Sequence, residues 1–227
     1  MPLRYLAELA MVVAMPAAAE DSYKIDRLDE PPPAALAAGV KDTLGARVYR
    51  VTDPGGKSLV DIWLRERTPA AAKPSGPKGA VLYPILAEGE LIGAVRFAAE
   101  GHDYRDQTIA PGVYTLRYGL QPVNGDHLGV SVNRDYVLLV PAASDTGVAD
   151  LPPKKLGVQS AEAAGTTHPA VLLLLAPPAK PPDGPSMVND AMLNTWGAIV
   201  ALPLEVKGEP NSVPLPMQIV VVGAKTD

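Results

Sequence analysis

Apolar and polar residues alternate along several short segments of this chain, and the alternation predicts β-strands. In LVDIWLRE (residues 59–66) every second residue is aliphatic, while aspartate, tryptophan and arginine occupy the positions between them. A period of two is typical of a strand with one buried face. Residues 113–120 show the same period, whereas residues 135–142 and 170–177 are apolar on both faces, as expected for central strands.

Glycine and proline separate these segments. The chain has 20 glycines and 25 prolines in 227 residues, so turns and extended connectors must be frequent. The turn sequence DPGG (53–56) predicts a hairpin of residues 47–51 with 59–66, and residues 80–99 are expected to form a second hairpin. The pattern predicts about eight or nine strands and at most one or two short helices, one of them at residues 186–194. Strands and helices do not alternate, which favours an all-β fold, an antiparallel β-sandwich of the immunoglobulin-like or jelly-roll kind.

The chain divides into three parts. Residues 1–19 contain Arg4, then an apolar run that ends in three alanines, which is typical of a secretion signal. Glu8 is unusual in such a signal, and an amphipathic helix packed on the domain is the alternative. Residues 20–45 form a polar, proline-rich lead-in, and residues 46–227 form a single β-sandwich domain. Its long loops are expected at residues 68–79, 144–169 and 177–197.

Composition and charge narrow the range of functions. Apolar residues make up 47% of the chain, enough for the core of a folded domain. The formal net charge is −5 and lysine and arginine form no run, which disfavours nucleic acid and anionic membrane surfaces as partners. The absence of cysteine excludes disulfides, thiolate metal sites and a cysteine nucleophile. With no transmembrane segment predicted after the signal, we expect the mature protein in the periplasm or outside the cell.

Five polar side chains between residues 101 and 136 are candidate metal ligands. They are His102, Asp103, Asp106, Asp126 and His127. Imidazole and carboxylate together suit a divalent metal such as zinc, copper, nickel or iron. The two groups flank the predicted strand at 113–120, however, and eight residues of strand span about 25 Å. The alternative is that these residues are solvated or form turns, as loop aspartates commonly do.

Other metal and catalytic chemistries have weaker support. Asp103 and Asp106 supply oxygen ligands for calcium, but the regular calcium-binding loop sequence is absent. Met187, Met192 and His168 are candidates for a copper carrier, although methionine more often fills cores. The sequence around Ser131 does not match the G-x-S-x-G nucleophile turn. No cofactor other than a divalent metal is therefore expected.

Two classes of function remain open. The first is a non-enzymatic module that binds a protein, glycan or cell-surface partner through its loops or a free strand edge. Its candidate ligand-binding residues are Trp63, Tyr104 and His127, although Trp63 could instead cover the sheet beneath a loop. The second is a hydrolase that uses either a metal or paired carboxylates, and its candidate residues are His102, Asp103, Asp126 and His127.

Overall fold

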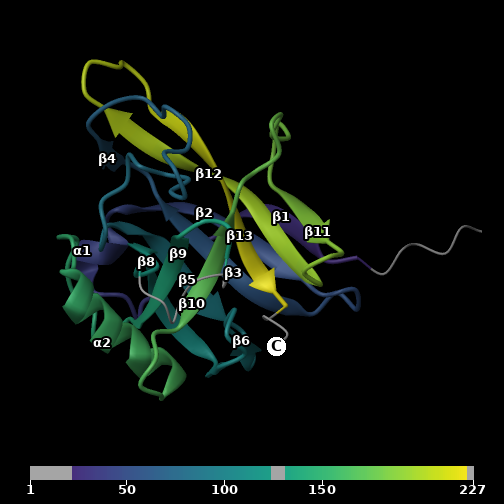
Figure 1. The fold of residues 1–227 in the computed structure, drawn as a ribbon. Helices are drawn as coiled ribbons and strands as arrows, with labels where there is room; N and C mark the ends of the chain where they lie inside the picture. Colours follow the sequence, from purple (N-terminus) through teal and green to yellow (C-terminus); the bar gives the residue numbers. More distant parts are fainter. Residues whose placement is uncertain (1–21, 124–130, 224–227) are drawn as a thin grey trace, which may run out of the picture.

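The structure is a computed structural model that describes residues 22–123 and 131–223. Almost all of its regular structure is β, with two short helices (Figure 1). In chain order the elements are β1 (Lys24–Asp29), α1 (Ala38–Lys41), β2 (Leu44–Thr52), β3 (Ser58–Arg65), β4 (Thr68–Ala70), β5 (Leu91–Phe97), β6 (Gly101–His102), β7 (Thr108–Ile109), β8 (Gly112–Leu120), β9 (Asp135–Pro141), α2 (Pro153–Ala164), β10 (Val171–Leu175), β11 (Ser186–Asp190), β12 (Thr195–Val206) and β13 (Val213–Val222). No helix in these two ranges is long and apolar enough to cross a membrane.

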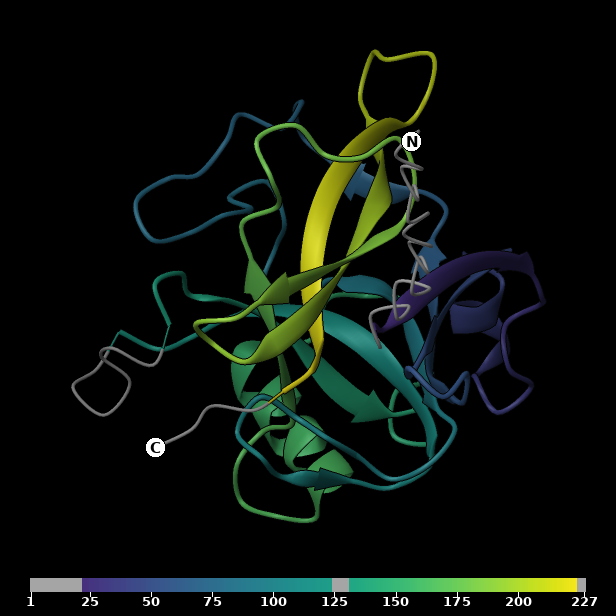
Figure 2. The same cartoon turned by 90° about the vertical axis from the view of Figure 1, so that its right-hand side faces the viewer.

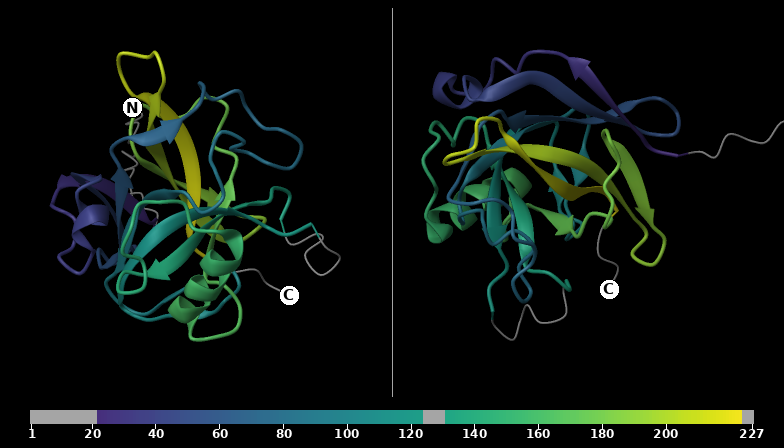
Figure 3. Two further views of the ribbon diagram at one scale, coloured as in Figure 1. Left: turned by 90° about the vertical axis from the view of Figure 1, so that its left-hand side faces the viewer. Right: turned by 90° about the horizontal axis from the view of Figure 1, so that it is seen from above.

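One large sheet curls around the main core. Its strands follow the order β1-β2-β3-β5-β8-β9-β10-β13-β12-β11, and β4 pairs with β12 at the side. The β4–β12 pairing is parallel, and the other pairings between the described strands are antiparallel. β10 connects the two halves, because residues 171–173 pair with β9 and residues 174–175 pair with β13. As a result β12 and β13 cross over the strands of the first half (Figure 2), and β11 comes close to β1 (Figure 3).

The all-β prediction is confirmed, but the sandwich is not. Hydrogen bonding runs from β1 to β11 without the break that would separate two layers, and the sheet has eleven strands rather than eight or nine. The local pattern indicates which face of a strand is buried, whereas the double pairing of β10 depends on the whole chain. The largest cluster of buried side chains includes residues from both halves of the sheet, among them Ile62, Leu116, Leu139, Leu202 and Met217.

Several predicted elements are correct and others need correction. The hairpin of β2 with β3 and the strands β8, β9 and β10 lie where the pattern predicts them. The predicted hairpin at residues 80–99 is wrong, because only β5 is a strand there. The preceding segment is a loop, and it is fastened by the buried carboxylate of Asp135, which accepts the N–H groups of Leu82 and Tyr83 at 2.8 and 3.0 Å.

The predicted helix at residues 186–194 is instead a hairpin. Residues 186–190 form β11, which pairs with the start of β12. Asp190 closes the turn by accepting the N–H groups of Met192 and Leu193, and Asn194 adopts a positive φ of 50°. Pairing with an available strand edge therefore outweighs the weak local preference for a helix.

Two segments predicted to lack regular structure contain it. Residues 20–45 include β1, an almost fully exposed strand that is held by its ladder with β2, and the short helix α1. Residues 144–169 include the twelve-residue helix α2, which packs on β9. Pro152 is the N-cap residue and Pro153 the first residue of this helix, and Gly165, at φ 62°, ends it. Proline at the start and glycine just after the end are typical of a helix, although the overall composition of this segment resembles that of a loop.

A buried arginine joins two loops to the middle of the sheet. Arg117 on β8 has no exposed surface, and its Nε and Nη2 atoms donate to the two carboxylate oxygens of Asp145, both at 2.8 Å. The same guanidinium donates to the carbonyl oxygens of Gly89, Gly147 and Ala149. The loop before β5 and the loop between β9 and α2 are therefore both positioned by the Arg117 guanidinium.

We predict that Arg117→Met lowers the free energy of unfolding by about 3–5 kcal/mol, because it leaves the buried Asp145 carboxylate without its cation. Denaturant titration followed by circular dichroism measures the change. The matched control is Arg105→Met at an exposed arginine, with an expected change within about 0.5 kcal/mol. A loss below about 1 kcal/mol for Arg117→Met would show that the pair is not needed to hold the loops.

Candidate functional site

The predicted metal ligands that the structure describes do not form a metal centre. His102 and Asp106 are exposed side chains at the surface, with 3.0 Å between Nδ1 and Oδ1. Asp103 lies between them in sequence but is fully buried. Its carboxylate accepts the backbone N–H groups of Arg105, Gln107 and Val171 and the side-chain amide of Gln107, at 2.8–3.0 Å. The carboxylate thus connects the β6–β7 turn to β10, and both of its oxygens already accept hydrogen bonds from the protein.

Asp126 and His127 lie outside the described residues, so the prediction for the complete set of five ligands stays a prediction. Within 22–123 and 131–223 no three or more histidine, aspartate or glutamate side chains are placed to hold a metal ion. The two methionines that are candidate copper ligands differ in their exposure to solvent. Met187 packs against the main core, whereas the side chain of Met192 is 96% exposed in the β11–β12 turn.

The two aromatic candidates have different positions. Trp63 is completely buried between the sheet and the segment before β2, and its Nε1 donates to the carbonyl oxygen of Glu30 at 2.9 Å. It therefore covers the sheet and offers no face to a ligand. Tyr104 lines an apolar cavity of about 230 Å³ together with Tyr136. Burial raises the pKa of Tyr136 to about 12 and raises the pKa of Tyr104, so both phenols stay protonated.

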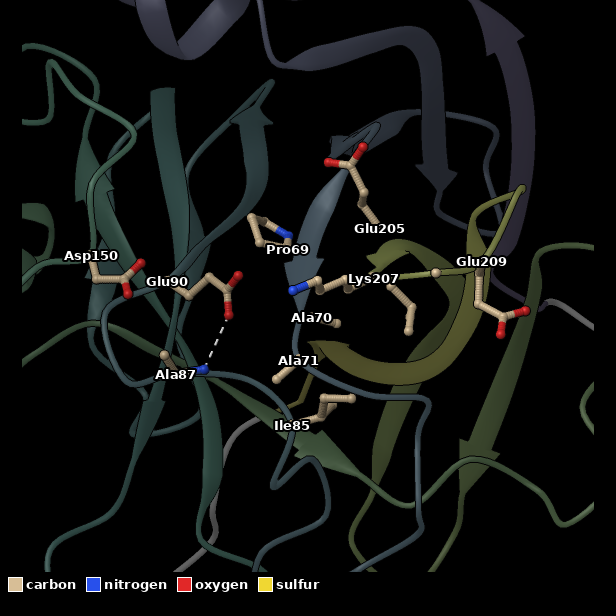
Figure 4. A pocket seen from close by; sticks show the side chains of 12 residues that line it. Pro69, Ala70, Ala71, Ile85, Ala87, Glu90, Asp150, Glu205, Lys207 and Glu209 are labelled. Carbon is tan, nitrogen blue, oxygen red and sulfur yellow. Dashed lines mark hydrogen bonds between the residues drawn. The ribbon is translucent and has the colours of Figure 1, made fainter.

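A larger cleft of about 760 Å³ lies between the loop after β4, the loop before β5 and the β12–β13 turn. Figure 4 shows its two walls, with Glu90 and Asp150 on one side and Glu205 and Glu209 on the other. Apart from Lys207 and Gly208, the rest of the lining consists of small or apolar side chains: Pro69, Ala70, Ala71, Ile85, Ala87 and Val206. The cleft therefore combines an apolar surface with carboxylates on opposite sides.

The Arg117 network holds the first wall. Arg117 binds the carbonyl of Gly89, the residue before Glu90, and the carbonyl of Ala149, the residue before Asp150. Gly89 also accepts the N–H of Leu151 at 3.1 Å and has a φ of 87°. A side chain at Gly89 would clash with the backbone of Leu151, so only glycine permits this close approach.

Glu90 is the most buried carboxylate of the cleft, with 5% of its surface exposed. Its Oε2 accepts the N–H of Ala87 at 3.0 Å, and its own N–H donates to the Ala87 carbonyl at 3.1 Å, which closes a turn. Burial raises the pKa of Glu90, and the charge of Asp150 adds to this, whereas the Ala87 hydrogen bond and Arg65 oppose it. The carboxyl thus loses its charge at a higher pH than an ordinary glutamate does.

The opposite wall carries charges of both signs. Glu205 forms an exposed ion pair with Arg67 at 3.5 Å, and Glu209 forms one with Lys73 at 3.0 Å. Lys207 extends from the turn into the space between the walls, and no described carboxylate lies within ion-pair distance of it (Figure 4). The lining thus contains four carboxylates and one amine, with no imidazole or hydroxyl side chain among its described residues.

No sequence pattern predicts this cleft. Its residues come from four separate stretches of the chain, and none of them belongs to a recognisable local motif. No family model matches the chain, and comparisons with curated proteins and solved structures found no significant match. The residues and their geometry must therefore carry any functional assignment.

We predict that Asp103 has a structural role that does not depend on metal. Asp103→Ala leaves buried backbone donors unpaired and should lower the free energy of unfolding by about 1–3 kcal/mol. The exposed His102→Ala is the matched control and should change it by less than about 0.5 kcal/mol. Thermal unfolding with and without a chelator measures the effect. A fall in melting temperature when the unmodified protein is chelated would contradict the prediction.

Proposed function

We propose that this protein is an exported, non-enzymatic binding module. We further propose that the cleft between Glu90 and Glu209 holds an extended, positively charged segment of a partner protein. The observation that carries the proposal is the arrangement of carboxylates on two facing walls around an apolar lining. An extended chain with alternating basic and small side chains would place its cations against the walls and its small residues against Ala70 and Ile85.

Two further features support an extended occupant. β4 borders the cleft and is hydrogen-bonded to β12 alone among the described strands, which leaves its other edge open for strand addition. Pro69 limits the number of main-chain bonds that such an added strand could form. Lys207 already brings an amine between the walls, in the position that a partner's cation would take (Figure 4).

The binding experiment uses a synthetic octapeptide of alternating lysine and alanine. We predict that Asp150→Asn and Glu90→Gln each weaken its affinity by about two- to fivefold, because each removes one negative charge from the same wall. Glutamine at position 90 can still accept the Ala87 N–H, so the turn should persist. We predict that Lys207→Ala strengthens binding by a similar factor, since it removes a competing amine. Isothermal titration calorimetry at low ionic strength measures all three affinities.

The matched control for the peptide experiment is Glu100→Gln, an exposed carboxylate outside the cleft. Its affinity for the octapeptide should equal that of the unmodified protein. An octapeptide of alternating glutamate and alanine should not bind. Equal affinities across the cleft variants, or equal binding of both peptides, would contradict the proposal.

A carboxylate hydrolase is the second candidate, and it is favoured by one observation. The pKa of the buried Glu90 is raised next to the exposed Asp150, which is the pattern of a general acid beside a general base. In that case Glu90→Gln would reduce the rate at which the protein hydrolyses a polysaccharide substrate by about a hundredfold or more. A binding module would show no hydrolysis before or after the substitution.

Export is proposed from the sequence of residues 1–19 alone. We predict that the chain isolated after secretion begins at Glu20. The small residues at positions 17–19 are typical of the site at which a secretion signal is cleaved, here after Ala19. Intact mass spectrometry of protein expressed from the full sequence measures the mass removed. Recovery of a secreted protein that retains residues 1–19 would contradict cleavage at this position.

A further inference from the structure

Three arginines on neighbouring strands line a second groove, which is separate from the acidic cleft. Arg27 on β1, Arg47 on β2 and Arg65 on β3 border a space of about 290 Å³. The ladder explains why they meet. Arg27 lies directly opposite Tyr49, and Arg47 is two residues before Tyr49 and so points to the same face of the sheet. Arg65 reaches the groove from the end of β3.

These arginines lack the ion-pair partners that three other arginines have. Arg50, Arg96 and Arg117 each form an ion pair with an aspartate. In contrast, Arg27, Arg47 and Arg65 form no ion pair or side-chain hydrogen bond with any described residue. With three arginines and one carboxylate, Glu66, the groove carries a local excess of positive charge in a chain with a net charge of −5.

Arg65 is the most enclosed of the three arginines. Its Nε atom is buried and has no hydrogen-bond partner among the described residues. A buried polar donor without an acceptor costs free energy, and this cost falls on the Arg65 guanidinium at the wall of the groove. The positive charge of Arg65 acts on Glu90, whose pKa it lowers, but Glu90 does not line this groove. Glu66 is the acidic residue of the lining, and its side chain lies against Gly45.

The rest of the groove is apolar or weakly polar. Tyr49, Pro203 and Pro214 line it, and Ser212 adds a hydroxyl. A neighbouring space of about 290 Å³ shares Arg27, Tyr49 and Pro214 with it and continues along the proline connector before β11. The groove therefore has a cationic end and a mainly apolar continuation that contains one carboxylate, Asp183.

We propose that this groove binds an organic anion that carries a phosphate or carboxylate head group and an apolar body. Arginine suits both head groups, because its planar fork donates two parallel hydrogen bonds to two oxygens. The head group lies against Arg47 and the terminal Nη atoms of Arg65. The body extends past Tyr49 towards the proline connector. The proposal does not depend on the function of the acidic cleft.

The test uses phenyl phosphate, benzoate, inorganic phosphate and the neutral benzyl alcohol as probes, by isothermal titration calorimetry at constant ionic strength. We expect at least one of the two aromatic anions to bind more tightly than inorganic phosphate, and benzyl alcohol not to bind. The anion that binds identifies the head group. We expect Arg65→Met to weaken its binding by about tenfold or more and Arg65→Lys to restore only part of it, since lysine cannot form the fork.

Arg47→Met is a second variant at a largely exposed position, and it should also weaken binding without affecting the fold. Arg105→Met, an exposed arginine outside the groove, is the matched control and should leave binding unchanged. Circular dichroism of each variant verifies folding. The proposal is overturned if neither aromatic anion binds more tightly than inorganic phosphate, or if Arg47→Met and Arg65→Met both bind the probe as the unmodified protein does.

Discussion

A guanidinium buried in the middle of the sheet needs an acceptor for each of its donors, and this requirement organises the loops around Arg117. A buried charge is tolerated only when it is paired and hydrogen-bonded. Arg117 meets the requirement with the carboxylate of Asp145 and three backbone carbonyls taken from two loops. Because two of those carbonyls belong to residues next to Glu90 and Asp150, the same interaction that satisfies the charge builds one wall of the acidic cleft.

Buried aspartates fasten other loops by the same physical means. Asp135 accepts two backbone N–H groups from the loop before β5 and the hydroxyl of Tyr118 at 2.6 Å. Asp103 holds the turn between β6 and β7 and connects it to β10. Carboxylates at these positions act as acceptors for backbone donors that no strand satisfies. The need for these acceptors accounts for the burial of Asp103 and Asp135.

The curl of the sheet explains where its two charged surfaces lie. β10 pairs with both halves, so the β12–β13 hairpin folds back over the strands at the start of the chain. One side of this contact forms the arginine groove between β1–β3 and β12–β13, and the turn of the hairpin forms a wall of the acidic cleft. Arg65 lies at the groove yet influences the pKa of Glu90 in the cleft, so the two surfaces are close enough to interact electrostatically.

The sequence by itself determined the all-β class and the core-facing residues of some strands, because a period of two is a local property that each segment carries alone. It indicated that Ile62 and Leu64 face the core, and they do. It left two roles open for Trp63, on the opposite face: binding a ligand, or covering the sheet beneath a loop. The second is observed, and it depends on the chain near Glu30 folding back over this residue. Only the tertiary structure brought Glu90 together with Glu209, and Arg27 together with Arg65. Charge clusters of this kind form between segments that are distant in sequence, so no local pattern encodes them.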